Sequence, residues 1–268
     1  MAVGTTNAAA SQEPDEQYLA MSQPEVSVVI PAYNEATYID RLLEALANQK
    51  HSNFEVIVSD AQSKDETPKV IKSFQGRLDV RLITSPPKGP ADGRNKGAAT
   101  AEGEWLLFLD ADDDFDDPFF INTLLTETKQ RNLQTSSAKI KVKEGNYINK
   151  FGMAKINYNY LKLLSHTKHP VAPGYCILTR RKLFESLNGF NEKIQFGEDY
   201  DYVSRSAKQG FGFIEQTYYY VDLRRAETEG FKLTLKGIGN EIYRHTHGYN
   251  LEKNPIKYEF GKHKRRGD

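Results

Sequence analysis

Acidic side chains follow two strand-like stretches of this sequence, and their spacing suits the binding of a cation. The stretch at 54–59 ends at Asp60, and the five apolar residues at 105–109 end at Asp110, with three more aspartates at 112–114. Such a cluster repels itself unless cations are near. Carboxylate oxygens at a strand end suit magnesium or manganese, with substrate phosphates completing the shell. In extended backbone, Asp110 and the aspartate two positions later can point the same way.

Other interpretations of this acidic segment are weaker. A solvated turn could cap the next helix through Asp116 or Asp117, but an apolar strand leading straight into the pair favours the metal interpretation. Haloacid-dehalogenase-like phosphatases usually place threonine or valine where this chain has Asp114, and their motif lies near the start of the domain. The chain has neither a Gly-x-x-x-x-Gly-Lys loop nor a Gly-x-Gly-x-x-Gly motif after a strand, so NTPase and dinucleotide-binding interpretations lose support.

A second group of carboxylates begins an amphipathic stretch further along the chain. Glu198 and Asp199 follow Gly197 directly, and Asp201 comes two residues after Asp199. Carboxylates at the start of a helix are common as caps and are stabilised by the helix dipole. The same position suits a general base that takes a proton from an attacking hydroxyl group. These residues alone leave both roles open.

Alternating strand and helix patterns in the first half of the chain position these carboxylates. Apolar and β-branched runs predict strands at 26–32, 54–59, 80–84 and 105–109. Apolar residues at helical spacing predict helices at 38–47, 68–74, 93–101 and 118–130. This alternation predicts an α/β fold with a doubly wound sheet. Ligands of such sheets bind beyond the carboxyl ends of the strands, where Asp60 and Asp110 lie.

The second half of the chain has a less regular pattern. We predict strands at 174–179 and 211–221, and helices at 181–187, 200–209 and 234–244. Residues 139–155 are polar, and we predict no element there. The segment at 257–266 is basic, and we expect a mobile tail.

Composition excludes several classes of protein. The 268 residues suffice for one large α/β domain or two small ones. Basic and acidic residues number 36 each, so no overall field favours nucleic acid, and we expect no such partner. The single cysteine, Cys176, excludes an intramolecular disulfide and fits a cytoplasmic location. No apolar run reaches the length of a membrane span, and 1–23 has no apolar signal core, so we expect a disordered leader there.

Taken in order, several segments resemble the motifs of family 2 glycosyltransferases, which have the GT-A fold. They are VVIPAYNE at 28–35, VSDAQSKDET at 58–67, GRNKG at 93–97, AEGEW at 101–105, LDADD at 109–113, LNGFNE at 187–192 and GEDYD at 197–201. The second segment lacks the second acidic residue and the glycine that commonly follow the first aspartate. The resemblance implies a Rossmann-like, doubly wound mixed sheet with helices on both faces. It also implies a catalytic domain at 24–250, with a nucleotide-binding half at about 24–115, an acceptor-binding half at about 116–250, and a basic tail at 251–268.

The resemblance also implies where the donor nucleotide lies. The wall around its base and ribose is formed by Pro31, Ala32, Tyr33 and Glu35. Asp60 accepts a hydrogen bond from the base or the ribose, and the remaining nucleotide contacts come from Arg94, Asn95, Asp110 and Ala111. From the residues alone, other roles stay open: packing for Tyr33, a helix start for Glu35, solvent exposure for Arg94 and capping for Asn95.

A divalent cation, Mn2+ or Mg2+, is the cofactor that the resemblance implies. Asp112, with Asp110, holds it, and it stabilises the charge that develops on the departing diphosphate. Many GT-A enzymes have a late histidine near the metal or the diphosphate, whereas this chain resembles a subset with paired arginines, Arg224 and Arg225. An arginine fork grips phosphate, so we expect one of the pair to contact the diphosphate. The alternative is a role for the histidines at 245 and 247.

On the acceptor side, the resemblance makes Asp199 the general base and Glu198 its neighbour. Asp201 either binds the acceptor or stabilises the helix. Pro173, Gly174 and Tyr175 resemble a loop whose glycine lets the backbone approach the donor sugar, although Gly174 could also be an ordinary turn.

The expected activity is therefore metal-assisted, inverting transfer from a nucleotide sugar, with a UDP-sugar favoured, to a glycan or lipid-linked acceptor. The alternatives are a nucleotidyltransferase that forms nucleotide sugars and a non-catalytic module that binds them. We expect a cytoplasmic protein. The basic tail could hold it at the inner membrane surface, and a solvated tail is the alternative.

Overall fold

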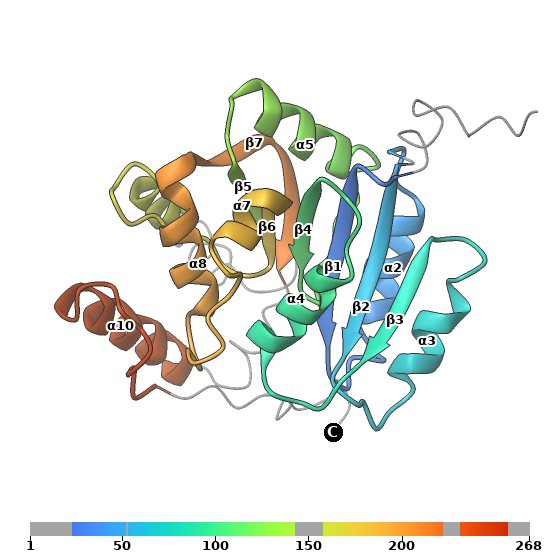
Figure 1. Cartoon of the computed structure of the whole chain (residues 1–268), viewed down its shortest axis with the longest axis horizontal. Helices are drawn as coiled ribbons and strands as arrows, with labels where there is room; N and C mark the ends of the chain where they lie inside the picture. Colours follow the sequence, from blue (N-terminus) through green and yellow to red (C-terminus); the bar gives the residue numbers. More distant parts are fainter. Residues whose placement is uncertain (1–22, 52, 143–157, 222–230, 257–268) are drawn as a thin grey trace, which may run out of the picture.

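The structure is a computed structural model, and it describes residues 23–51, 53–142, 158–221 and 231–256 (Figure 1). Most of the predicted leader and the basic part of the predicted tail lie outside these ranges. Within them, no helix is both long enough and apolar enough to cross a membrane.

One seven-stranded sheet forms the centre of the molecule, in the order β3-β2-β1-β4-β6-β5-β7. Its strands are β1 (Val26–Ala32), β2 (Phe54–Asp60), β3 (Val80–Thr84), β4 (Trp105–Leu109), β5 (Thr135–Val142), β6 (Cys176–Arg180) and β7 (Phe211–Val221). The first four are parallel, β6 runs antiparallel to β4 and β5, and β7 is parallel to β5. The sheet is therefore mixed, as the resemblance implied.

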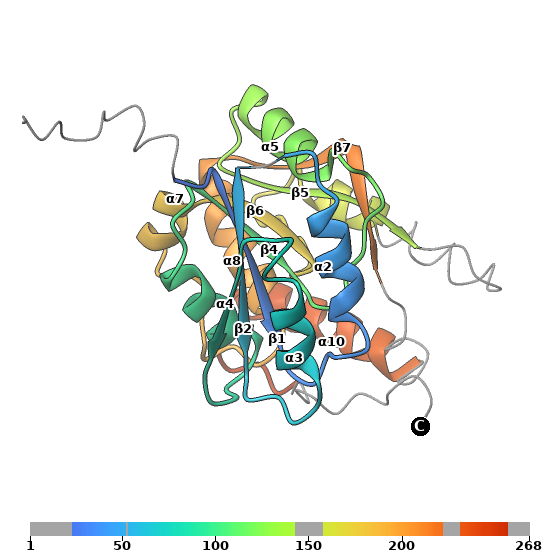
Figure 2. The same ribbon diagram turned by 90° about the vertical axis from the view of Figure 1, so that its right-hand side faces the viewer.

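Helices cover both faces of the sheet. They are α2 (Ile39–Ala47), α3 (Thr67–Ser73), α4 (Pro90–Ala99), α5 (Phe120–Gln130), α7 (Arg181–Ser186), α8 (Glu198–Ser206) and α10 (Phe231–Thr246), with a further helix at 158–164 and a 3-10 turn, η1 (Ala207–Gln209). Figure 2 shows α2 and α3 on one side of β1 and β2, and α4 on the other.

Alternation along the strands builds a separate apolar core on each face. In β1, Val28 and Ile30 join the core under α2, α3 and α5, while Val29 joins the core under α4, α7 and α8. All three side chains are fully buried. A strand buried on both faces reads as a continuous apolar run, which is why β1, β2 and β4 could be predicted from the sequence.

Two described elements were not predicted from the sequence. They are β5 and the helix at 158–164; in addition, α4 and α10 each begin three residues earlier than predicted. In β5, the buried side chains of Thr135 and Ser136 hydrogen-bond to the hydroxyls of Thr179 and Thr128, at 2.9 and 2.6 Å. Because hydroxyl pairs replace apolar contacts in the first half of β5, only its second half, in which Ala138, Ile140 and Val142 alternate with lysines, carries a strand pattern.

Candidate active site

The acidic segment after β4 forms a closed turn. The backbone N–H of Asp110 donates to Oδ2 of Asp113 at 2.7 Å, and the N–H of Asp113 donates to the carbonyl of Asp110 at 3.0 Å. Asp113 is buried, and burial, together with the charges of Asp110 and Asp112, raises its pKa well above the ordinary value. Asp114 pairs through its backbone with Tyr220 of β7. Asp113 and Asp114 therefore hold the turn, while Asp110 and Asp112 stay half-buried at its surface.

Arg94 of α4 links this turn to the second half of the chain. Its guanidinium donates from Nη2 to Asp110 at 2.6 Å and from Nη1 to Glu198 at 2.8 Å, and it lies over the ring of Phe190 at 5.4 Å. The side chain is buried. Burial opposes its charge, yet Asp110 and Glu198 together raise the pKa of Arg94 above the ordinary value. This burial excludes the alternative in which Arg94 is a solvent-exposed helix residue.

Asp199 lies beside Arg94 and Glu198 in the first turn of α8. Its Oδ2 accepts a hydrogen bond from the N–H of Gly174 at 2.6 Å, and its Oδ1 accepts one from the N–H of Tyr200 at 2.8 Å. Burial and the charge of Glu198 raise the pKa of Asp199 to about 7, against the lowering effect of Arg94. A carboxylate with a pKa near neutrality is suited to general base chemistry.

Gly174 fits against Arg94 in a way that no other residue could. A Cβ at this position would lie 2.4 Å from Nη2 of Arg94 and 3.0 Å from its Cζ. The predicted glycine loop is thus part of the same cluster as Asp110, Glu198 and Asp199. It is the close approach of the side chain of Arg94 that requires a glycine here.

On the opposite side of the turn, two loops that follow β1 and β2 are hydrogen-bonded to each other. The N–H of Asn34 donates to Oγ of Ser63 at 2.8 Å, and its side-chain oxygen accepts from the N–H of Lys64 at 2.8 Å. The N–H of Glu35 donates to Oγ1 of Thr67 at 2.9 Å. These bonds fix the two loops as one wall at the carboxyl edge of the sheet.

Asp60 forms the inner end of this wall. It lies beside Ala32 in the register of β1 and β2, and it is buried. Its carboxylate accepts hydrogen bonds from both the N–H, at 3.0 Å, and the hydroxyl of Ser63. Pro31 and Tyr33, from the same predicted nucleotide wall, are half-buried at this edge.

Asn95 supports the loop that precedes α8. Its Nδ2 donates to the carbonyl of Phe190 and to Oε1 of Glu192, both at 2.9 Å, and its Oδ1 accepts from the N–H of Phe190 at 2.9 Å. A Cβ on Gly189 would come within 2.6 Å of that oxygen, and Gly189 has a φ of 63°. This contact could not be predicted from the sequence, because it joins residues 95 positions apart. A base contact by Asn95 stays a prediction.

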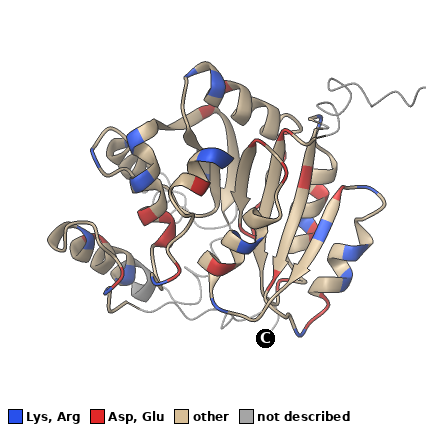
Figure 3. Ribbon diagram, viewed as in Figure 1, with Lys and Arg blue, Asp and Glu red and all other residues tan. Residues whose placement is uncertain are grey.

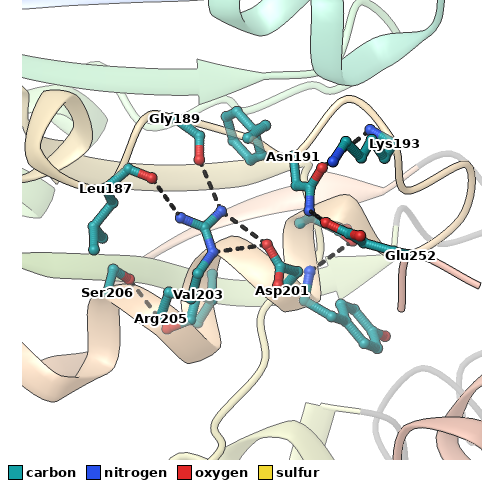
Figure 4. A network of polar contacts seen from close by, with 12 residues as sticks. Leu187, Gly189, Asn191, Lys193, Asp201, Val203, Arg205, Ser206 and Glu252 are labelled. Atoms are coloured by element: carbon teal, nitrogen blue, oxygen red, sulfur yellow. Dashed lines mark hydrogen bonds and ion pairs between the residues drawn. The ribbon is translucent and has the colours of Figure 1, made fainter. Parts of the chain in front are cut away.

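Asp201 belongs to a second supporting network (Figure 4). Its Oδ2 accepts a hydrogen bond from Nε of Arg205 at 2.8 Å. The same guanidinium donates to the carbonyls of Leu187 and Gly189, at 2.9 and 2.8 Å. Of the two roles open for Asp201, the structure supports stabilisation of the helix and of the loop before it.

The remaining predicted residues are the late arginine pair and the two late histidines. Arg224 and Arg225 lie outside the described residues. His245 contacts the hydroxyl of Tyr249 at 3.1 Å, and His247 stacks on Tyr243. Both histidines thus contact α10 or the turn after it.

The chemistry of the acidic turn fits a divalent cation that is shared with a substrate. Among the described residues, no cluster of three or more acidic, histidine or cysteine side chains could hold a metal alone. Asp110 and Asp112 supply hard oxygen ligands, but Asp110 already shares one oxygen with Arg94. Magnesium and manganese accept such incomplete sites when substrate phosphates supply further oxygens.

Comparison with known proteins identifies the relatives of this chain. The sequence model of the family described as glycosyl transferase family 2 matches residues 27–187. An uncharacterized glycosyltransferase of Rickettsia bellii is 30% identical over 210 residues, 76% of this chain and 29% of that protein. The GalNAc(5)-diNAcBac-PP-undecaprenol beta-1,3-glucosyltransferase of Campylobacter jejuni is 33% identical over 94 residues, 34% of this chain and 30% of that protein. The chain therefore spans less than a third of the length of these relatives.

Solved structures show the same fold. The mannosyltransferase PcManGT of Pyrobaculum calidifontis, in complex with GDP-Man and Mn2+, matches with a TM-score of 0.68 and 20% identity, over 84% of this chain and 64% of that one. Residues 1–349 of TarS from S. aureus, in complex with UDP-GlcNAc, match with a TM-score of 0.61 and 23% identity, over 82% of this chain and 66% of that one.

Proposed function

This chain belongs to glycosyltransferase family 2, and on that premise we propose that it transfers a sugar from a nucleoside diphosphate to an acceptor hydroxyl. The observation that carries the proposal is the position of Asp199. Its pKa is raised to about 7, and a single buried guanidinium, that of Arg94, separates it from the acidic turn. This arrangement supports a proton acceptor on one side of Arg94 and, on the other, a cation site completed by substrate phosphate.

We assign the general base to Asp199 and an inverting mechanism to the reaction. Its carboxylate takes the proton of the acceptor hydroxyl while that oxygen attacks the anomeric carbon. The bond from the anomeric carbon to the diphosphate oxygen breaks in the same step, and the nucleoside diphosphate leaves with the electron pair. Glu198 holds Arg94, so its role is to position the base and the turn rather than to exchange a proton.

The donor is assigned to the edge formed by the β1–α2 and β2–α3 loops and the acidic turn. In this proposal the base and ribose lie against Pro31, Ala32, Tyr33 and Glu35, with Asp60 as hydrogen-bond acceptor. Asp112 and Asp110 are the residues that would hold Mn2+ or Mg2+, which when bound neutralises the charge of the departing diphosphate. The nucleotide-binding half is then about 24–115, and the acceptor-binding half about 116–250.

The proposed diphosphate contact by Arg224 or Arg225 is consistent with the end of β7. Tyr220, the second-last residue of that strand, exchanges backbone hydrogen bonds with Asp114 at 2.7 and 3.3 Å. The last described residues before the arginine pair thus lie against the acidic turn.

The names of related proteins favour a particular donor and acceptor class. TarS was solved with UDP-GlcNAc, and the Campylobacter relative is named for transfer to an undecaprenol-linked glycan. We therefore propose a UDP-sugar as donor and a glycan or lipid-linked glycan as acceptor. That relative is also named for a beta product. Because the usual UDP-hexoses are α-linked, a beta product corresponds to inversion.

Release of nucleoside diphosphate from a panel of UDP-, GDP- and dTDP-sugars, with Mn2+ and with candidate acceptors, tests the proposal. Asp199→Asn should bind donor nearly normally and transfer about two to four orders of magnitude more slowly, the usual effect of a positioned base. Asp201→Asn is the matched control, since that carboxylate supports a loop. Equal loss in both variants would remove Asp199 as the base, and retained anomeric configuration in the product would exclude the single displacement.

A further inference from the structure

The chain reverses direction directly after α10, through a backbone conformation that tyrosine rarely adopts. Gly248 and Tyr249 follow one another with φ of 63° and 66°, in the left-handed region. Glycine adopts this region freely, whereas a bulky side chain there is strained and persists only where its surroundings fix it. We call residues 247–256 the exit segment. The strain at Tyr249 indicates that contacts of its side chain hold this segment in place.

The ring of Tyr249 provides those contacts. It stacks on the ring of His169, with the two centroids 3.5 Å apart and the planes 13° from parallel. Arg244, a buried residue of α10, lies over the Tyr249 ring at 5.1 Å, and its Nη1 donates to the carbonyl of His169 at 3.1 Å. The end of α10 and the exit segment are therefore both fixed to His169.

The residues that follow His169 form a stiff connection to the candidate active site. Residues 170–174 are all buried, and two of them are prolines, whose φ is fixed. At the end of this stretch, the N–H of Gly174 donates to Oδ2 of Asp199 at 2.6 Å. A displacement of His169 would therefore move the donor that holds one oxygen of Asp199.

A second part of the exit segment packs against the start of α8. A Cβ on Gly197, two residues before Asp199, would lie 3.0 Å from Nδ2 of Asn240 and 3.2 Å from Cδ1 of Leu251. Leu251 is buried, and Gly197 has a φ of 90°. Nδ2 of Asn254 donates to Oδ1 of Asn240 at 2.6 Å. The exit segment, α10 and the first turn of α8 are thus in close contact.

The exit segment also contacts the loop before α8. Nδ2 of Asn191 donates to Oε1 of Glu252 at 2.8 Å (Figure 4). This loop leads into the acidic first turn of α8, which is drawn in red in Figure 3. The exit segment therefore contacts both stretches of chain that hold Asp199, the one that ends at Gly174 and the one that begins α8.

We propose that the exit segment positions Asp199 for proton transfer, with Tyr249 and Leu251 as the positioning residues. Tyr249 acts through His169 and the buried stretch after it, and Leu251 acts through Gly197. A base must be held in line with the attacking hydroxyl, and a misplacement of about 1 Å can cost about a hundredfold in rate. The step of proton transfer rests on the proposed function, whereas the positioning of the carboxylate does not.

Amide exchange measured by NMR tests the positioning without donor or acceptor. Tyr249→Asn removes the ring stack and keeps the backbone, because asparagine tolerates the left-handed region. The Gly174 N–H should then exchange with solvent about tenfold faster, and the Tyr200 N–H, which donates to Asp199, should do so in Leu251→Ala. Tyr249→Phe keeps the ring and should exchange like the unmodified chain. Lys253→Ala, at an exposed residue of the same segment, is the matched control.

Transfer kinetics give the second readout. In Tyr249→Asn and Leu251→Ala, kcat should fall about ten- to a hundredfold. The KM for the donor should stay unchanged, because the proposed donor edge lies on the other side of Arg94. Leu251→Met should restore kcat, since methionine fills a similar volume.

Three results would decide against parts of this account. Unchanged exchange at both amides would overturn the proposal. Equal acceleration of all amides, those of β1 and β2 included, would also overturn it, since a general loss of stability would then explain the change. Faster exchange of the Gly174 N–H in Tyr249→Asn, together with full activity of Asp199→Asn, would support the positioning of the carboxylate and remove Asp199 as the base.

Discussion

Replacing Gly174 with alanine tests how firmly Arg94 is held between the two halves of the site. The new Cβ would lie 2.4 Å from Nη2 of Arg94, whereas ordinary contact begins near 3.4 Å, so the guanidinium must move by about 1 Å. Its hydrogen bonds to Asp110 at 2.6 Å and to Glu198 at 2.8 Å oppose this movement. The φ of Gly174 is not positive, so backbone strain does not contribute.

Two quantities should change together in Gly174→Ala. Loss of one partner in a buried ion pair costs roughly 3 to 5 kcal/mol. Because the second pair can survive, we expect the free energy of unfolding to fall by roughly 2 to 4 kcal/mol in urea titrations. Arg94 lowers the pKa of Asp199, so its displacement should raise that pKa above about 7. Since only the deprotonated carboxylate accepts a proton, the rising limb of kcat/KM with pH should move to higher pH.

Gly76→Ala is the matched control, because no atom lies within 4 Å of its new Cβ. It should leave both stability and the pH profile unchanged. If Gly174→Ala also leaves both unchanged, Arg94 can move without loss, and its role as a fixed link between the turn and α8 is refuted. A loss of stability with an unmoved pH profile would separate Arg94 from the proton affinity of Asp199.

Three further substitutions examine other parts of the site. Asp112→Asn should lose most turnover and most manganese-dependent donor affinity; unchanged kinetics across a manganese titration would remove the metal assignment. In the unmodified chain the pKa of Asp199 is about 7 in the folded state and 3.8, the ordinary value, in the unfolded state. Between these two pH values only the folded state keeps the proton, so the free energy of unfolding falls as the pH rises through that window. Asp199→Asn should abolish this fall, gaining up to about 4 kcal/mol above pH 7 in urea unfolding; a gain that is equal at every pH contradicts the raised pKa. Asn95→Ala should cost about 1 to 3 kcal/mol, because the N–H and carbonyl of Phe190 lose their partner; unchanged stability would show that water replaces the amide.

The local part of this fold was predictable, and the contacts between distant residues were not. The buried strand that precedes Asp110 has an apolar sequence, so its position and that of the carboxylates after it follow from pattern alone. In β5, paired hydroxyls at Thr135 and Ser136 give the same burial without that pattern. The polar first half of β5 could not be recognised as part of a strand until its partners were known, although the alternation of Ala138, Ile140 and Val142 with lysines indicates a strand in its second half.

The candidate site shows the same limit. Sequence motifs predicted Asp110, Glu198 and Asp199 as site residues. Each motif is a short local segment, so the motifs do not show how these residues contact one another. The link between them is Arg94, which reaches a residue 104 positions away. Its burial depends on the packing of α4 against α8 and the acidic turn, and nothing in the helical pattern of α4 indicates which of its residues is enclosed. The space that Gly174 leaves for it is likewise a property of the assembled fold.

The wall formed by the β1–α2 and β2–α3 loops has a consequence for turnover. The loops are tied together by hydrogen bonds within the chain, from Asn34 to Ser63 and from Glu35 to Thr67, so a nucleotide that binds there needs little ordering of the protein. If this wall holds the base and ribose, the nucleoside diphosphate product keeps all of its contacts with the wall after the sugar has left. We therefore expect strong product inhibition, with departure of the nucleotide rather than bond formation setting the rate.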